Sequence, residues 1–214
     1  MIGVDVSIWN NDRYFRGEIP WNLLKSSGID FVIVRTGAGR SYQEEYFKQN
    51  VDGAHQAGLL VGAYHYSYAF TSQQIQEEAK FCKQIISDAG ILLELPVFLD
   101  MEDGDAHKRN NGFNWEKGYI TNLCRTWLEE IKPLNTGIYA SLSWFEDWID
   151  WQGLLKEYTF AVWNAQYANN DFLQGYMWQF TENLQIGGQQ FDGNVLYDDC
   201  HIAGLNPWNY VTQS

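Results

Sequence analysis

Long hydrophobic runs are missing from this sequence, and cysteine and proline are scarce. Among 214 residues with 3 Cys and 4 Pro, no stretch of about 18 apolar residues occurs, so we expect no transmembrane helix. The start, MIGVDVSIWN, has neither a basic segment nor an apolar core and does not predict a signal peptide. Three cysteines cannot all pair with one another. Cys82 and Cys124 stand among apolar residues and Cys200 near the end, and we expect reduced thiols rather than a disulfide.

Positive charge is also scarce, because 14 Lys and Arg face 27 Asp and Glu, for a formal net charge of −13. Such a field repels polyphosphate chains and anionic lipids, so nucleic acid and membrane surfaces are not expected partners. With 45% hydrophobic and 19% charged residues, the composition excludes a disordered chain and favours one globular domain. Aromatic residues are abundant instead, with 10 Trp, 13 Tyr and 12 Phe. Their rings suit the faces of sugars, although they are also ordinary core residues.

Short β-rich runs recur along the chain and alternate with helical patterns in its earlier part. Runs such as FVIVR and PVFL are continuously apolar, which is typical of parallel strands covered on both faces. The pattern predicts a one-domain α/β protein, a (β/α) barrel with about eight strands and fewer helices. An open doubly wound sheet is the alternative. The predicted strands are Ile2–Val6, Phe31–Arg35, Leu60–Tyr64, Val97–Asp100, Thr136–Ala140, Thr159–Trp163, Met177–Phe180 and Gly193–Tyr197.

Three helices have recognisable sequence signals. In Trp115–Ile131, apolar residues recur at helical spacing. Two further helices are indicated by the pattern of a capping box, a Ser or Thr followed three residues later by Glu or Gln. These pairs are Ser41 with Glu44, before a helix through Val51, and Thr71 with Gln74, before a helix over Ile75–Ile86.

Side chains that could act chemically follow the predicted strands, where active residues of (β/α) barrels project. The strongest signal is PVFLDME, because Asp100 and Glu102 point to the same face of an extended chain. Two carboxyls in a small volume separate their pKa values, so that one is protonated while the other is ionised. Such a pair can hydrolyse a glycosidic bond, although surface Asp-x-Glu pairs are common.

Other candidates are weaker on the residues alone. Asp5 is typical of a turn, and His65 of a satisfied hydrogen-bonding side chain. A metal site of His65, Asp100 and Glu102 is conceivable, yet no two-His helix motif or paired-cysteine spacing supports it. The GAGR segment lacks the spacing of a dinucleotide loop, and no Ser occupies a nucleophile elbow. A catalytically silent sugar-binding barrel and a metal-dependent barrel hydrolase are the alternatives to a glycosidase.

Eight segments occur in the order found in glycoside hydrolase family 25. They are GVDVSIWN, FVIVRTGAGR, AGLLVGAYHYSYA, PVFLDME, TGIYAS, AVWNAQY, MWQF and FDGNV. Over almost its whole length the chain resembles this family of phage and bacterial lysozymes (N-acetylmuramidases), which includes the Chalaropsis-type enzymes. The resemblance implies a flattened, irregular TIM-like barrel without cofactor or metal. It also implies cleavage of the β-1,4 bond between N-acetylmuramic acid and N-acetylglucosamine in peptidoglycan.

The resemblance assigns roles by position within the matching motifs. Glu102 corresponds to the proton donor and Asp100 to the second catalytic carboxylate, while Asp5 and Asp192 match two further acidic residues of the groove. Arg35 would support these groups, because several carboxyls in one groove need a cation or donors to stay partly ionised. The positions expected to line sugar subsites are Tyr64, Tyr66, Tyr139, Trp163, Gln166 and Trp178.

Two positions depart from the family pattern. Asn164 stands where an aliphatic residue is usual, and Gly193 where a larger residue is common, so the carry-over to the adjacent Trp163 and Asp192 is weaker. Likeness of the Asp-x-Glu strand to substrate-assisted chitinases favours participation of the substrate's N-acetyl group, with Asp100 as its stabiliser. Retention through an enzyme nucleophile and inversion by water are the alternatives, which the carboxyl separation and the sugar pose decide.

The expected partner is bacterial peptidoglycan, attacked at the cell wall by a monomeric domain. Residues 1–214 are expected to form one catalytic domain, and no wall-binding module is recognisable among them. The missing signal favours a phage endolysin, cytoplasmic in the infected host before release, over a secreted autolysin whose signal has been trimmed.

Overall fold

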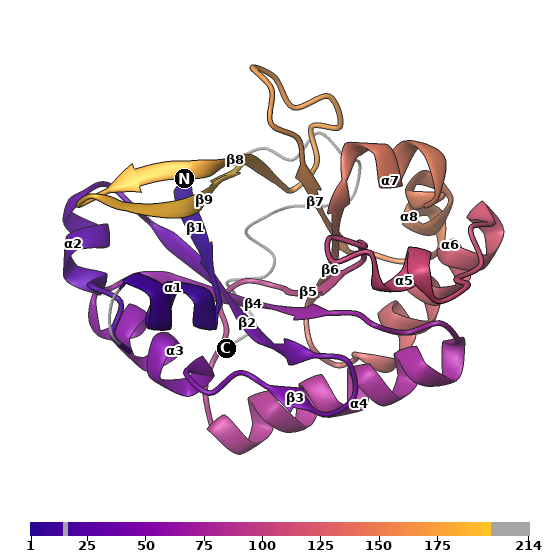
Figure 1. Ribbon diagram of the computed structural model, residues 1–214, viewed down its shortest axis with the longest axis horizontal. Helices are drawn as coiled ribbons and strands as arrows, with labels where there is room; N and C mark the ends of the chain where they lie inside the picture. Colours follow the sequence, from indigo (N-terminus) through magenta and orange to yellow (C-terminus); the bar gives the residue numbers. More distant parts are fainter. Residues whose placement is uncertain (15–16, 198–214) are drawn as a thin grey trace.

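Eight strands of the computed structural model close into a barrel, and a short ninth strand lies at its edge (Figure 1). The structure describes residues 1–14 and 17–197, with residues 12–14 described by their backbone alone. The strands are β1 (Ile2–Val6), β2 (Phe31–Ala38), β3 (Tyr42–Gln43), β4 (Leu60–Tyr66), β5 (Val97–Asp100), β6 (Thr136–Ser141), β7 (Ala161–Ala165), β8 (Met177–Ile186) and β9 (Gln189–Leu196).

The order around the barrel is β1-β2-β4-β5-β6-β7-β8-β9, and β9 pairs again with β1. Neighbours from β1 to β8 run parallel, whereas β9 is antiparallel to both of its neighbours. The short β3 pairs with the end of β2. This closed order confirms the irregular α/β barrel with about eight strands and excludes the open doubly wound sheet.

Helices lie around the outside of the barrel (Figure 1). Three of them are ten residues or longer, namely α3 (Phe47–Gln56), α4 (Ser72–Ala89) and α6 (Lys117–Glu130). The connections from β7 to β8 and from β8 to β9, both fully described, contain no helix, as the spacing of the last strands predicts. The helices are α1 (Ile8–Tyr14), α2 (Trp21–Ser26), α3 (Phe47–Gln56), α4 (Ser72–Ala89), α5 (His107–Asn110), α6 (Lys117–Glu130), α7 (Leu142–Asp147) and α8 (Trp151–Glu157).

The predicted elements are confirmed in order, and most of their boundaries agree within a few residues. The capping box of Thr71 and Gln74 is present and opens α4. The helix predicted over Trp115–Ile131 is α6. The two last strands are longer than predicted, because β8 and β9 continue past the barrel as a hairpin that turns at residues 187–188.

The capping box predicted for Ser41 and Glu44 is wrong. The chain forms β3 there, and α3 begins only at Phe47 without a side-chain cap. The physical reason is a competing use of Glu44, whose carboxylate pairs with Arg35 and accepts the backbone N–H of Ile8 at 3.0 Å. A tertiary ion pair therefore replaces the local helix signal.

Alternation of side chains along the strands creates two apolar layers. In β5, Val97 and Leu99 belong to the outer layer, which packs against the helices, while Phe98 belongs to the cluster that fills the barrel. Large rings fit inside because small residues face them. A Cβ atom on Gly137 would lie 2.4 Å from the Phe98 ring, so a larger residue there would force the barrel apart.

Cys82 and Cys124 are buried free thiols, as predicted, whereas Cys200 lies outside the described residues. Burial raises the pKa of both thiols to about 12, so they remain protonated packing residues. Across the described ranges, every helix is too short or too polar to cross a lipid bilayer.

Candidate active site

The strand ends bring four predicted acidic residues to one mouth of the barrel. In β5, the inward direction that buries Phe98 also carries Asp100 to the mouth, and Glu102 follows just beyond the strand. Asp5 ends the inward row of β1 and lies opposite Asp192 in the β1–β9 ladder. The charges of these side chains act on one another's pKa values, so they form one electrostatic cluster.

Asp100 and Glu102 form the first acidic pair. Asp100 is 4% exposed, and its Oδ1 atom has no hydrogen-bond partner among the described residues. Burial, followed by the charge of Glu102, raises the pKa of Asp100 well above its ordinary value. Glu102 is half-buried beside Gly104, and burial raises its pKa as well. Two such groups titrate as a pair, so one holds a proton in a range where the other is ionised.

A buried lysine accompanies this pair. Lys108, in α5, is 1% exposed, and its Nζ donates to the carbonyl oxygens of Ser67 and Glu102. Burial lowers the pKa of Lys108. Its positive charge lowers the pKa of both Asp100 and Glu102, opposing the effect of burial.

Asp5 and Asp192 form the second acidic pair, and neutral amides hold the carboxylate of Asp5. Asp5 is 7% exposed, and its Oδ2 accepts Nε2 of Gln179 at 2.9 Å and Nδ2 of Asn194 at 2.8 Å. Burial, then the charge of Asp192, raises the pKa of Asp5 well above its ordinary value. Burial, then the charge of Glu182, raises the pKa of Asp192 to about 6.

Aromatic side chains fix these two amides in turn. The hydroxyls of Tyr139 and Tyr167 donate to Oε1 of Gln179 at 2.9 and 3.0 Å. Nε1 of Trp163 donates to Oδ1 of Asn194 at 2.9 Å. Because each amide oxygen is occupied by these donors, each NH₂ group must point toward the carboxylate.

A hollow of about 570 Å³ opens beside the first acidic pair, and Glu102 lines it. The other lining residues are mainly aromatic or charged, and several come from loops rather than strands. They are Ile8, Trp9, Arg35, Ala38, Tyr42, Tyr66, Tyr68, Gly104 and Asp105. Trp9 is 68% exposed, so much of its ring is open to a ligand. An acid beside open rings is an arrangement that can bind and protonate a sugar.

Two more predicted positions, Arg35 and Tyr64, lie at this mouth with defined neighbours. Arg35 forms its ion pair with Glu44 rather than with an acid of the cluster, while its charge still lowers the pKa of Asp100. Tyr64 is half-buried and meets the Trp163 ring edge-on at 6.2 Å.

The position of Trp163 does not suit direct contact with a sugar. It is 1% exposed and packs edge-on against Phe98 and Tyr139, with ring centres 5.0 and 4.5 Å away. A ring without a free face cannot stack on a ligand, so Trp163 is a core residue that orients Asn194. Tyr139, at 8% exposed, has a comparable position and orients Gln179.

Trp178 lies at a different hollow from the first acidic pair, and Gln166 contacts it from the loop after β7. Along β8 the inward residue is Gln179, so its neighbour Trp178 points the other way. The Trp178 ring lines a hollow of about 500 Å³ together with the loop after β7, and its Nε1 donates to the backbone oxygen of Gln166 at 2.7 Å. The side chain of Gln166 accepts the backbone N–H of Phe172 at 3.1 Å and so helps to shape this loop.

The two departures from the family pattern have local structural roles. Asn164 is buried and donates from Nδ2 to Asp171 at 2.8 Å and to Gln166 at 3.2 Å, which ties the loop after β7 to the barrel. A Cβ atom on Gly193 would lie 2.9 Å from the Phe180 ring, so the bulged β8–β9 pairing leaves no room for a side chain.

Sequence reasoning missed Lys108, Gln179 and Asn194. Lys108 stands in a polar segment, where a lysine is expected to be solvated, and nothing local indicates its burial. Gln179 and Asn194 could have been found by extending strand parity, because Asn194 lies two residues from Asp192 and Gln179 two residues from Met177, a residue of the cluster that fills the barrel.

His65 is a satisfied core residue, as the residues alone indicated. Its two ring nitrogens are hydrogen-bonded to Thr36 Oγ1 and to the Gly39 carbonyl, each at 2.8 Å. Burial lowers its pKa to about 4, so the ring is neutral near pH 7. Within residues 1–14 and 17–197, no three His, Cys, Asp or Glu side chains form a group able to hold a metal ion.

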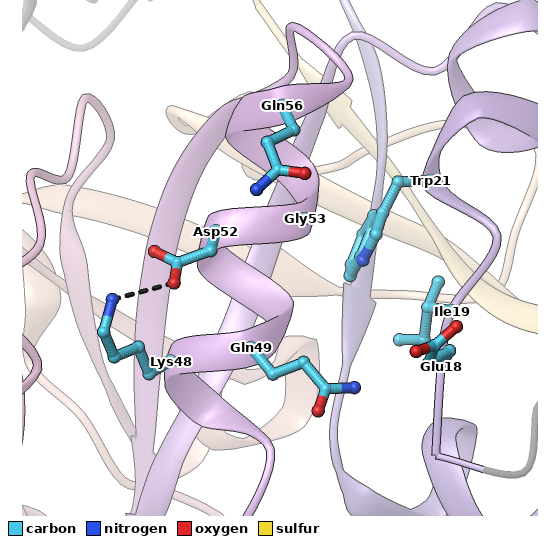
Figure 2. A pocket seen from close by; sticks show the side chains of 8 residues that line it. All are labelled: Glu18, Ile19, Trp21, Lys48, Gln49, Asp52, Gly53 and Gln56. Atoms are coloured by element: carbon cyan, nitrogen blue, oxygen red, sulfur yellow. Dashed lines mark hydrogen bonds and ion pairs between the residues drawn. The ribbon is translucent and has the colours of Figure 1, made fainter.

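A further hollow of about 560 Å³ lies on the flank of the barrel, where Trp21 lies alongside α3 (Figure 2). The close approach requires Gly53, because a Cβ atom there would lie 2.4 Å from the Trp21 ring. The charged residues Lys48 and Asp52 pair with each other at 2.7 Å. Both are well exposed, so this hollow lacks the buried carboxyl pair that distinguishes the barrel mouth.

The chain is similar to several cell-wall enzymes. It is 27% identical to Lysozyme M1 of Streptomyces globisporus over 202 residues, which cover 89% of this chain and 65% of that protein. The CTP1L endolysin structure is 25% identical with a TM-score of 0.74, covering 92% of this chain and 66% of that one.

The modular autolysin LytC of Streptococcus pneumoniae, solved with a synthetic peptidoglycan ligand, has a TM-score of 0.78 at 20% identity. The match covers 92% of this chain and 46% of LytC, so the chain spans about half to two thirds of these relatives. The family model for glycosyl hydrolases family 25 matches residues 4–189. The chain therefore belongs to glycosyl hydrolases family 25.

Proposed function

We propose that this protein is a lysozyme that hydrolyses the β-1,4 bond between N-acetylmuramic acid and N-acetylglucosamine in peptidoglycan. Family membership and the similarity to Lysozyme M1 support this activity. Residues 1–214 are proposed to act as one monomeric catalytic domain at the bacterial wall, without cofactor. The observation that carries the proposal is the carboxyl pair of Asp100 and Glu102 at the mouth of the barrel.

Glu102 is proposed as the general acid. It lines the hollow and is less buried than Asp100, so its carboxyl group can reach a glycosidic oxygen placed there. Burial raises its pKa, which keeps a population protonated at a higher pH than an exposed glutamate would allow. On transfer of this proton, the bond from the anomeric carbon to the leaving oxygen breaks and positive charge develops on the ring.

Asp100 is proposed to stabilise that positive charge through the substrate's own N-acetyl group. A buried carboxylate oxygen without a partner, such as Oδ1 of Asp100, is costly unless a ligand supplies the missing donor. The N–H of an N-acetyl group is such a donor. Its hydrogen bond to Asp100 would orient the acetyl oxygen toward the anomeric carbon and stabilise the cyclic intermediate. Water then attacks the anomeric carbon, the bond to the acetyl oxygen breaks, and the proton of the water passes to the Glu102 carboxylate.

Asp5 and Asp192 are proposed to hold the opposite side of the groove, and Arg35, Tyr64 and Tyr66 to line the subsites. The fixed position of Asp5 between two amides supports a role in orienting substrate or water. Trp178 could contact the glycan only farther along the groove, through the hollow formed by the loop after β7, and Gln166 is proposed to support that loop.

The test is lysis of purified bacterial walls by Glu102→Gln, with Glu146→Gln, an exposed glutamate of α7, as the matched control. We expect at least about a hundredfold loss for Glu102→Gln and no loss for the control, because an amide cannot donate the proton. Activity of Glu102→Gln within about tenfold of the unmodified protein would overturn the assignment.

Mass spectrometry of the released muropeptides identifies the bond. New reducing ends on N-acetylmuramic acid support a muramidase, whereas reducing ends on N-acetylglucosamine or free stem peptides contradict it. Wall binding without any released fragment would point to the silent sugar-binding barrel instead.

A further inference from the structure

Lys108 is the most unusual charged residue of the site and has no part in the proposed chemistry. Among the described lysines and arginines it is the only one that is fully buried. An ammonium group has three N–H donors. Two of them are used by the carbonyl oxygens of Ser67 and Glu102, and the group stands 5.6 Å from the centre of the Tyr66 ring. These contacts therefore hold the positive charge in one position, unlike the charge of a solvent-exposed lysine side chain.

These contacts connect the ends of two neighbouring strands. Ser67 directly follows β4, and Glu102 lies two residues after β5. The loop that carries Lys108 is ordered by Asp103, whose carboxylate accepts the backbone N–H groups of Lys108 at 2.7 Å and Arg109 at 3.0 Å. The main chain of the proposed general acid is thus held by the same ammonium group that faces its carboxylate.

Acidic groups face Lys108 from several of the elements around it. Asp100 and Glu102 face it from β5 and its extension, Asp103 from its own loop, and Glu78 from α4. Glu78 is itself 1% exposed, and its Oε2 accepts the hydroxyl of Ser67 at 2.6 Å. The other neighbours are uncharged near neutral pH: the ring of Tyr66 on β4 and the buried thiol of Cys124 on α6.

The second cation near the cluster cannot replace Lys108. Arg35 lies on β2 and forms an ion pair with Glu44, so much of its charge is already compensated. Nζ of Lys108 donates to neutral carbonyl oxygens and forms no ion pair within the described residues, so its charge acts on all of the surrounding acids.

We propose that Lys108 is a positioning residue that sets the working pH of the Asp100–Glu102 pair by holding a fixed positive charge beside it. The inference rests on the proposed glycosidase function of that pair. Lys108 favours the ionised form of both acids. Without it, both would keep their protons to higher pH, which moves the ionisation of Asp100 and the deprotonation of Glu102 in the same direction.

The test is the pH profile of wall lysis by Lys108→Met, which keeps the length of the side chain but removes its charge. The acid limb of the profile reports the ionisation of Asp100, the stabilising carboxylate. The alkaline limb reports the loss of the proton from Glu102, the general acid. We expect both limbs to move up by about one pH unit. The control is Lys48→Met, which removes an exposed charge on α3 and should leave both limbs in place.

A second variant should move the alkaline limb of the pH profile in the opposite direction. Asp103→Asn retains an acceptor for the loop but removes a negative charge that raises the pKa of Glu102. We expect its alkaline limb to move down. If Lys108 only supports the fold, Lys108→Met lowers kcat or the melting temperature while both limbs stay where they were, and this result would overturn the proposal.

The two variants also separate this proposal from the proposed function. If Lys108→Met does not fold, an unmoved alkaline limb in Asp103→Asn overturns the proposal on its own. If the unmodified protein lyses no wall, the proposed function fails, and the same variants are compared by NMR titration of ¹³C-labelled carboxyl groups. Unchanged titration of Asp100 and Glu102 in folded Lys108→Met would then overturn the role of Lys108, and an upward shift of both would support it.

Discussion

The two acidic pairs at the barrel mouth are built in opposite ways. Asp5 is held by the two amides of Gln179 and Asn194. Asp100 has one oxygen without any partner among the described residues, and a buried lysine supplies charge rather than a hydrogen bond. Both carboxyls are buried to a similar extent, at 7% and 4% exposed, so burial alone does not explain the difference.

The difference teaches which carboxyl is free to meet a ligand. A fully satisfied polar group stabilises its own position and has little to gain from a new partner. A buried acceptor without a partner lowers stability and is retained where function uses it. The Asp5–Asp192 side therefore supplies fixed geometry, and the Asp100–Glu102 side supplies the reactive groups.

The largest expected effect is on the reactive side. Asp100→Asn removes the negative charge proposed to stabilise the developing cation, so we expect kcat to fall by about 10³. The free energy of unfolding should change by no more than about 1 kcal/mol, because Oδ1 makes no hydrogen bond that the substitution could break. Kinetics on soluble glycan and urea unfolding measure the two quantities, with exposed Asp147→Asn as control. A destabilised variant with near-normal kcat would reverse our reading of this side.

The second prediction concerns the fixed side. Asn194→Ala removes a donor to Asp5 and the acceptor of Trp163 Nε1, leaving two buried groups with a missing partner. We expect a loss of about 2 to 4 kcal/mol in unfolding free energy. Asn170→Ala, in the exposed loop after β7, is the matched control. Equal stability of the two variants would show that the amides do not fix Asp5.

The strands and the acids could be predicted from the sequence, and the groups that tune the acids could not. Continuous apolar runs act locally, so the sequence predicts β5 with the bounds that the structure has, and Glu102 follows two residues after it. The burial of Lys108 depends on Ser67, which lies 41 residues away, and no local signal reports such a contact. The family resemblance points to Trp178 as a sugar contact, whereas strand parity places its neighbour Gln179 on the inward face of β8.

The third prediction concerns the pH dependence of stability that Asp192, on the fixed side, should cause. The pKa of Asp192 is raised to about 6 in the folded protein, above its unfolded value of 3.8. The folded state therefore binds the proton more tightly, and this group makes stability fall as pH rises from about 4 to about 6, with no further change above. The loss should reach about 1 to 2 kcal/mol, given the partial exposure of the group. In urea unfolding, the free energy of unfolding of Asp192→Asn should not show this fall between about pH 4 and about pH 6. If the fall is unchanged in the variant, another group causes it.

The smallest expected effect tests whether the open aromatic rings serve the reactive side. Trp9 follows β1, the strand of Asp5, yet it lines the hollow of Glu102 and is 68% exposed. Trp9→Ala should raise KM by about three- to tenfold without lowering kcat or stability, because it removes a stacking face but no charge. Phe172→Ala is the matched control, since Phe172 is 70% exposed but lies at the hollow of the loop after β7. A larger rise in KM for Phe172→Ala would move the main glycan contacts toward Trp178, and the proposed separation between a reactive and a fixed side would then have to include that loop.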